Sequence, residues 1–218
     1  MKPRLIIGNK NYSSWSLRAW LVMREAGIEF DEERIALDTP STSEEIAHYT
    51  KSRTVPVLQL GDLTIWDSLA IAETVAERWP AKQLWPEDPD ARAHARSISA
   101  EMHAGFAALR ECMPMNCRAM GRRVTLPDEV AADIDRVFAI WSDCQHQYAG
   151  DNGWLFGQFS IADAMYAPVV LRFRTYGINL PESASFYPQR LLASESMQEW
   201  LAAAETETEV IEKDEKGR

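Results

Sequence analysis

The strongest constraint on the fold is the uneven distribution of strand-forming segments along the chain. Four short segments with strand character occur at residues 4–7, 30–37, 55–60 and 63–66, and strand signals are absent beyond Pro80. Helical patterns separate the first three of them, which gives the order β-α-β-α-β-β-α within about 80 residues. We therefore expect a mixed sheet with helices packed on it in the first part of the chain.

The helices of this first part begin and end at recognisable signals. Ser13 or Ser14 stands where the N-cap of the first helix belongs, and Gly27 is a typical stop. Asp67 and Ser68 cap a later helix that must end at Pro80, because proline disfavours a helical conformation in the residue before it.

The second part of the chain is expected to be entirely helical. Helical patterns cover approximately residues 90–112, 128–148, 160–176 and 195–204. They predict a helical bundle with its own core. We therefore divide the chain into an α/β domain at 1–80, a proline-rich linker at 81–89 and an all-α domain at 90–218. Within the last domain, residues 205–218 are mostly charged and are expected to be frayed.

The acidic composition argues against two classes of partner. The chain carries 33 Asp and Glu against 23 Lys and Arg, a formal net charge of −10. Such a surface repels phosphate backbones and anionic lipids, so neither nucleic acid nor a membrane is an expected partner. The longest apolar run, at 164–171, contains Pro168 and is too short to span a bilayer.

Cysteine and histidine usage indicates a cytoplasmic protein without a metal site. The three cysteines, Cys112, Cys117 and Cys144, show no disulfide framework, which favours reduced thiols. The four histidines are scattered and form no ligand pair with them. We expect neither a metal nor a bound cofactor.

A hydroxyl-rich turn at residues 11–18, with the sequence Asn-Tyr-Ser-Ser-Trp-Ser-Leu-Arg, is the first candidate site. The N-terminus of a helix offers free N–H groups and a partial positive charge, which stabilise an anion such as a thiolate. A serine hydroxyl at that point can donate a hydrogen bond to the sulfur. The alternative is a simple helix N-cap.

Two further candidate sites follow along the chain. If the Val55–Pro56 bond is cis, the backbone of Val55 faces outward and can pair with an extended peptide; the alternative is a trans proline at a strand start. Ser68 and the N–H groups behind it can receive a carboxylate, while Asp67 can receive an ammonium group. The two residues therefore suit an α-amino acid moiety, with simple helix capping as the alternative.

These three segments, in this order and spacing, resemble the glutathione site of cytosolic glutathione S-transferases of the serine type, such as the theta and zeta classes. The resemblance extends over nearly the whole chain, since the linker near residue 85 and the helical second part also match. It implies a thioredoxin-like N-terminal domain, an all-helical C-terminal bundle domain and a cytoplasmic homodimer acting in detoxification.

The resemblance also implies roles for individual residues around the thiol. Ser14 would stabilise the glutathione thiolate, with Ser13 as the close alternative. Val55 would pair through its backbone with the cysteinyl part, and Pro56 would be the cis proline. Arg18, one turn beyond Ser14, would add to the positive field of the site.

For the two ends of glutathione, the resemblance implies a second group of residues. Asp67 and Ser68 would hold the γ-glutamyl end, and Arg53 or Lys51 would reach the glycyl carboxylate. Trp15 departs from the zeta pattern, because a cysteine occupies this position there. That departure argues against zeta-type isomerase activity and against disulfide exchange at the site, since residues 1–111 contain no cysteine.

In the second part of the chain, we make predictions for two further segments. Ser160 and Asp163 form a capping box, which we interpret as structural. The segment Met113–Arg118 either lines a pocket for an electrophile or is a packed loop between helices.

The function predicted from these residues is a glutathione transferase. Glutathione serves as co-substrate, and its thiolate attacks a small electrophile held against the helical domain. One alternative is a glutathione-dependent isomerase or peroxidase using the same site. Another, of a different class, is a non-catalytic binding or regulatory protein. The identity of the electrophile is left open by the sequence.

Overall fold

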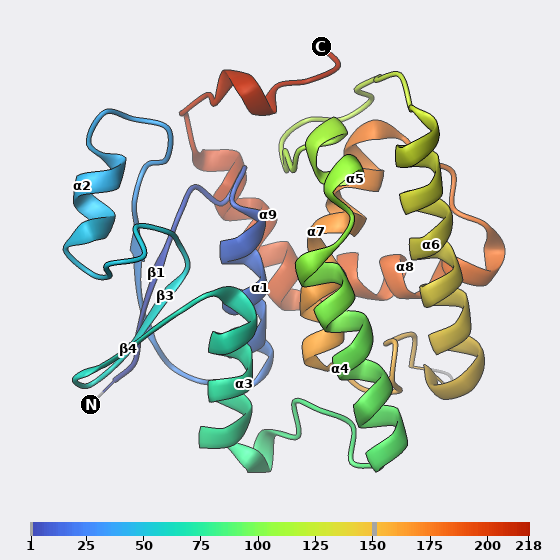
Figure 1. Ribbon diagram of the computed structural model, residues 1–218, viewed down its shortest axis with the longest axis horizontal. Coiled ribbons are helices and arrows are strands. Elements are labelled where there is room, and N and C mark those ends of the chain that lie inside the picture. Colours follow the sequence, from blue (N-terminus) through green and yellow to red (C-terminus); the bar gives the residue numbers. More distant parts are fainter. Residues whose placement is uncertain (1, 150–151) are drawn as a thin grey trace.

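A four-stranded mixed sheet lies beside a larger group of helices in the computed structural model, which describes residues 2–149 and 152–218 (Figure 1). The strands are β1 (Arg4–Ile7), β2 (Asp31–Arg34), β3 (Val57–Leu60) and β4 (Leu63–Trp66). Their order in the sheet is β2-β1-β3-β4. β1 runs parallel to β2 and antiparallel to β3, and β3 and β4 form an antiparallel hairpin. The predicted mixed sheet is thus confirmed.

Helices cover both faces of this sheet. They are α1 (Ser14–Glu25), α2 (Thr42–Ala47) and α3 (Ser68–Arg78), and Figure 1 shows α2 on the opposite side of the sheet from α1 and α3. Side chains alternate between the faces of a strand. Accordingly Ile6 and Val57 pack with Ile46 of α2 in a small core, while Leu5 and Leu58 join the main core.

The described residues after α3 contain helices and no strand, as the sequence predicts. The helices are α4 (Pro89–Ala104), α5 (Ala107–Cys112), α6 (Asp128–Cys144), α7 (Ile161–Tyr176), α8 (Phe186–Leu192) and α9 (Glu195–Thr206). The predicted helix at 90–112 is interrupted at Phe106, which has a left-handed backbone conformation (φ 56°). α7 is buried along nearly its whole length and packs against α1 and α4. It therefore joins the sheet part to the helical part.

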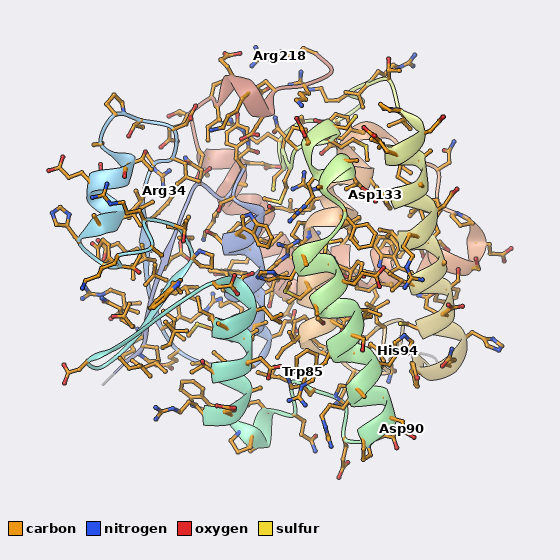
Figure 2. The ribbon with its side chains drawn as sticks, viewed as in Figure 1. Arg34, Trp85, Asp90, His94, Asp133 and Arg218 are labelled. Carbon is orange, nitrogen blue, oxygen red and sulfur yellow. The ribbon has the colours of Figure 1, made fainter. Side chains whose placement is uncertain are left out.

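The segment between α3 and α4 is packed rather than extended. Leu84 and Trp85 are buried, and Trp85 Nε1 donates a hydrogen bond to a carboxylate oxygen of Glu73 in α3 at 3.0 Å. Figure 2 shows the Trp85 side chain beside the lower end of α3. None of the helices within 2–149 and 152–218 is long and apolar enough to cross a bilayer.

The structure overturns one expectation about the second part and decides between two alternatives for another segment. The C-terminal residues 205–218 are not frayed: α9 continues to Thr206, and Ile211 beyond it is buried. The charges that suggested fraying are instead paired with other parts of the protein, as described below. Met113 and Met115 belong to the main core, so the packed-loop interpretation of this segment is correct and the pocket interpretation is wrong.

Candidate functional site

The two adjacent serines at the start of α1 have different surroundings. Ser13 is the N-cap: its Oγ accepts a hydrogen bond from Ser16 N at 3.4 Å and donates one to Ser16 Oγ at 2.8 Å. The hydroxyl of Ser14, the first residue of the helix, makes no hydrogen bond to the described part of the chain. Ser13 is therefore committed to capping, whereas Ser14 retains a free hydroxyl at the positive end of α1.

A cavity of about 360 Å³ opens in front of this turn, and we call it the serine cavity. Its walls come from the turn, from the segment leading into α2, from the residues before β3 and from the C-terminal segment. Its lining includes Ser14, Asp38, Arg53, Val55 and Lys213. Arg53 thus lines this cavity. Lys51 is exposed and lines neither this cavity nor the one at the start of α3.

A second cavity of about 430 Å³ lies at the start of α3, and we call it the α3 cavity. It is lined by Val55, Pro56, Asp67, Ser68, His103 and Arg110, among others. The two cavities adjoin, since Trp15, Thr54 and Val55 line both. Seven of the nine predicted site residues, all but Lys51 and Arg18, therefore line these two adjoining cavities.

The peptide between Val55 and Pro56 is cis, as the resemblance implies. β3 begins only at Val57, so Val55 is not part of the sheet ladder. Its N–H and carbonyl have no hydrogen-bond partner among residues 2–149 and 152–218. A backbone donor and acceptor are thus available at the junction of the two cavities.

Asp67 and Ser68 differ in how far the protein already satisfies them. Asp67 Oδ1 accepts hydrogen bonds from the N–H groups of Leu69 and Ala70 at 2.9 and 3.1 Å, and its Oδ2 lies 2.7 Å from His103 Nε2. Ser68 is 1% exposed, and its buried Oγ has no partner in the described structure. An unsatisfied buried hydroxyl is unfavourable. A ligand carboxylate at the start of α3 would satisfy it.

Arg18 lies beneath the site rather than in it. It is 1% exposed, its Nε donates to Met165 O of α7 at 3.0 Å, and its guanidinium carbon lies 4.2 Å from the ring centre of Trp15. Burial, followed by the nearby Arg172 and Arg110, lowers the pKa of Arg18 to about 9. The group remains protonated at neutral pH, so it contributes positive charge below the turn.

The sequence analysis missed several residues that the fold brings to this hollow. His103 comes from α4, Arg110 from α5 and Lys213 from the C-terminal segment. The Arg110 guanidinium carbon lies 5.2 Å from the ring centre of Trp15. No local pattern marks these residues, because their proximity arises only from packing of the helical part against the serine turn.

The cysteines do not supply a nucleophile to this site. Cys112, Cys117 and Cys144 are free, and none lines either cavity. Burial raises the pKa of both Cys117 and Cys144 to about 12, so their thiols stay protonated at neutral pH. A thiolate at the serine turn would have to belong to a ligand.

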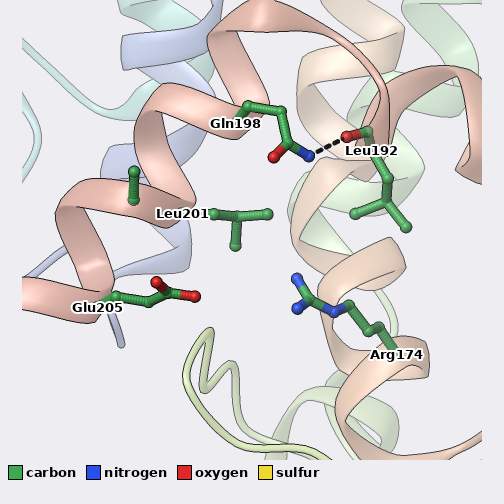
Figure 3. Close-up of a pocket in the computed structure, with 6 residues that line it drawn as sticks. Arg174, Leu192, Gln198, Leu201 and Glu205 are labelled. Atoms are coloured by element: carbon green, nitrogen blue, oxygen red, sulfur yellow. Dashed lines mark hydrogen bonds between the residues drawn. The ribbon is translucent and has the colours of Figure 1, made fainter.

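A separate cavity lies between α7, α8 and α9 (Figure 3). Arg174 and Glu205 face each other across it, and Gln198 Nε2 donates to Leu192 O beside it. It contains none of the predicted site residues, and no residue of it lines the serine or α3 cavity. We therefore do not assign it to the site.

Two protein-family models match the chain. The model described as glutathione S-transferase, N-terminal domain, matches residues 12–78, and the one described as glutathione S-transferase, C-terminal domain, matches residues 92–203. Every residue of the serine turn from Tyr12 onward and both residues at the start of α3 lie in the first match.

Similar proteins with other names are found as well. The chain is 27% identical to maleylacetoacetate isomerase of Rattus norvegicus, over 90% of this chain and 91% of the relative. It is 26% identical to a stringent starvation protein A homolog of Coxiella burnetii, over 92% and 91%. Among solved structures, a Burkholderia glutathione transferase homolog with bound glutathione shares the fold, with a TM-score of 0.71, 23% identity and coverage of 94% and 99%.

Proposed function

Because the chain belongs to the glutathione S-transferase family, we propose that it binds glutathione in the two adjoining cavities and activates its thiol for attack on a small electrophile. One observation carries the proposal: the Ser14 hydroxyl, the Val55 backbone and the Ser68 hydroxyl have no hydrogen-bond partner among residues 2–149 and 152–218, and these three residues line the two adjoining cavities. Their order matches a peptide with a thiol in its middle and a carboxylate at its end.

The γ-glutamyl end of glutathione would occupy the α3 cavity. Its carboxylate would accept hydrogen bonds from the Ser68 hydroxyl at the N-terminus of α3. Its ammonium group would lie beside Asp67, whose carboxylate is only partly exposed and is shared with His103. The cysteinyl backbone would pair with Val55 in the manner of an added strand.

The thiol would then lie at the N-terminus of α1. A free cysteine thiol has a pKa of about 8.5, so little thiolate forms at neutral pH. The Ser14 hydroxyl would donate a hydrogen bond to the sulfur, and the helix end together with the buried charge of Arg18 would favour the anion. The proton leaves to solvent, and the thiolate attacks an electrophile placed beside it.

The helical part would supply the electrophile side of the site. Trp15 offers an aromatic face at the junction of the cavities, and Arg110 reaches it from α5. We propose that residues 1–80 hold glutathione, that 81–89 connect the two parts, and that 90–218 provide the electrophile pocket. No metal and no bound cofactor is required by this scheme.

We further propose that the protein works as a cytoplasmic homodimer in the removal of electrophiles, as the resemblance implies. The proposal is supported by exposed apolar side chains at both ends of β4: Leu63 at one end, and at the other Trp66, which also lines the α3 cavity.

Three alternative functions stand beside the transferase, and the first two use the same binding site. A glutathione-dependent isomerase is supported by the similarity to a protein named maleylacetoacetate isomerase, although Trp15 replaces the cysteine of the zeta pattern; a peroxidase would require the same thiolate. A non-catalytic regulatory protein is supported by the similarity to a protein named stringent starvation protein A homolog.

Titration with reduced glutathione, followed by calorimetry and by ultraviolet thiolate absorbance across pH, separates these functions. Saturable binding with a lowered thiol pKa supports a working transferase or isomerase, and assays with electrophilic and isomerisable substrates then distinguish the two. Binding without a change in the thiol pKa indicates a glutathione sensor or carrier. Absence of binding at millimolar glutathione overturns the proposal and favours the non-catalytic regulatory protein.

A further inference from the structure

The C-terminal residues 207–218, which we call the strap, return to the serine turn after α9. In Figure 1 the strap runs across the top of the molecule, from the end of α9 past the end of α1 that carries the serines. Ile211 is buried, and Lys213 lines the serine cavity together with Ser14. The strap is thus a wall of the site and not only its neighbour.

Glu207 ties the start of the strap to the loop before the serines. Its carboxylate, 6% exposed, accepts hydrogen bonds from the backbone N–H groups of Lys10 and Asn11 at 2.7 and 3.0 Å. Arg118 reinforces this region by donating to the carbonyl oxygens of Glu207 and Glu209. The backbone entering the serine turn therefore depends on one buried carboxylate from the far end of the chain.

Glu215 ties the other end of the strap to the same turn. Its carboxylate, 7% exposed, accepts from Tyr12 Oη at 2.6 Å, Asn116 Nδ2 at 2.8 Å and an Arg122 nitrogen at 2.6 Å. Tyr12 immediately precedes Ser13. Two strap carboxylates thus hold three consecutive residues of the turn, at positions 10–12.

Lys213 lies between these two anchors and lines the serine cavity. Its Nζ is 2.7 Å from Asp38 Oδ1, but the two side chains are 68% and 46% exposed. An exposed ion pair of this kind is worth little, so the ammonium group is free to turn to a ligand. Lys213 and Arg53 are the two cationic side chains found among the residues lining this cavity.

From these contacts, and resting on the proposed function, we propose that the strap is part of the glutathione site. Lys213 binds the carboxylate at the glycyl end of glutathione, which enters the serine cavity once the γ-glutamyl end occupies the α3 cavity. Glu207 and Glu215 are positioning residues that hold the turn carrying Ser14.

The binding role of Lys213 is tested with Lys213→Met, which removes the charge and keeps most of the apolar stem. Lys216→Met is the matched control, because Lys216 is on the same strap, donates to Glu111 O and lines neither cavity. The dissociation constants of glutathione and of its glycyl monoethyl ester are measured by calorimetry for both variants and for Lys213→Arg.

We expect Lys213→Met to weaken glutathione binding about three- to fivefold, the strength of one exposed charge pair. Binding of the ester, which lacks the glycyl charge, should be unaffected by this substitution, and Lys213→Arg should restore affinity for glutathione. Equal affinities of Lys213→Met and Lys216→Met, or an equal loss with the ester, would overturn the role of Lys213.

The positioning role is tested with Glu207→Gln and Glu215→Gln, using Glu101→Gln as a control in an exposed ion pair with Arg136. Each strap variant should raise the pKa of the bound glutathione thiol and lower kcat, with KM for the electrophile nearly unchanged. A loss of thermal stability with an unaltered thiol pKa would show that the two carboxylates only stabilise the fold.

The outcomes separate this inference from the proposed function. If the wild-type protein does not bind glutathione, the proposed function fails and the inference fails with it. If the wild-type protein binds glutathione and the strap variants match their controls in binding and in thiol pKa, only the inference is overturned.

Discussion

Helices α1 and α7 both start at serines, yet the two starts have opposite surroundings. At α7, Ser160 N and Ser160 Oγ both donate to Asp163 Oδ2, at 2.8 and 2.9 Å, and Leu155 N donates to the other carboxylate oxygen at 3.0 Å. At α1, Ser13 caps the helix while Ser14 faces a cavity with a free hydroxyl.

The difference shows what separates a structural helix start from a binding one. Asp163 is fully buried beside Ser160, so the protein itself satisfies the groups of this capping box. The start of α1 faces the serine cavity, which is enclosed by the segment leading into α2, the residues before β3 and the strap. A helix N-terminus becomes a binding site only where the fold leaves its donors unused and open.

The largest effect is expected at the start of α7, where the protein satisfies its own hydrogen bonds. Asp163→Ala leaves buried N–H groups of Leu155 and Ser160 without an acceptor, so the free energy of unfolding should fall by about 3 kcal/mol. Denaturant titration measures this loss. Glutathione affinity of the folded fraction should not change, and a stability loss below about 1 kcal/mol would contradict the structural role of this carboxylate.

The pH dependence of stability should also distinguish the start of α7 from the start of α1. Burial, opposed by hydrogen bonds from Leu155 and Ser160, raises the pKa of Asp163 to about 7, so the folded chain holds a proton that the unfolded chain has lost. The contribution of Asp163 to stability is thus greatest below about pH 4 and is lost as pH rises through about 7.

Comparison with Asp163→Asn isolates this effect from the other carboxylates. The wild-type protein should lose on the order of 3 kcal/mol more than Asp163→Asn between pH 4 and 7. Denaturant titrations at several pH values measure both curves. Parallel curves would mean that Asp163 titrates normally.

Ser14→Ala should affect catalysis and leave stability nearly unchanged. Loss of the hydroxyl that contacts the thiolate should lower kcat/KM about tenfold to hundredfold, because one hydrogen bond to the developing anion disappears. Ser13→Ala is the matched control and should instead cost about 1 kcal/mol of stability through the lost cap. A larger catalytic loss in Ser13→Ala would reverse the assignment of the two serines.

Ser68→Ala gives the smallest expected change. Ser68 is the first residue of α3, and its hydroxyl has no partner among the described residues. Glutathione should bind about three- to tenfold more weakly, since the hydroxyl meets only one ligand carboxylate. Because the hydroxyl has no partner in the described structure, unfolding should be unaffected or slightly less favourable. Calorimetry and thermal melting measure the two quantities, and unchanged affinity would exclude Ser68 from the site.

Much of the fold was predictable because its signals are local. Alternating apolar residues, turn residues and caps act over a few positions, and they placed the four strands, the starts of α1 and α3 and the helical nature of the second part. The candidate site was predictable to the same extent. Ser14, Val55 and Ser68 each lie where a strand, a loop or a helix begins.

Tertiary structure alone decided which of the two serines keeps a free hydroxyl and which distant residues share its cavity. The pairing of His103 with Asp67, the approach of Arg110 to Trp15 and the return of Lys213 to the turn depend on packing between segments far apart in the chain. The charged residues at 205–218 predicted a frayed C-terminus, because a charged side chain indicates exposure unless it has a partner. In the folded protein this segment is packed and several of its charges are paired. Those partners become visible only when the whole chain has folded.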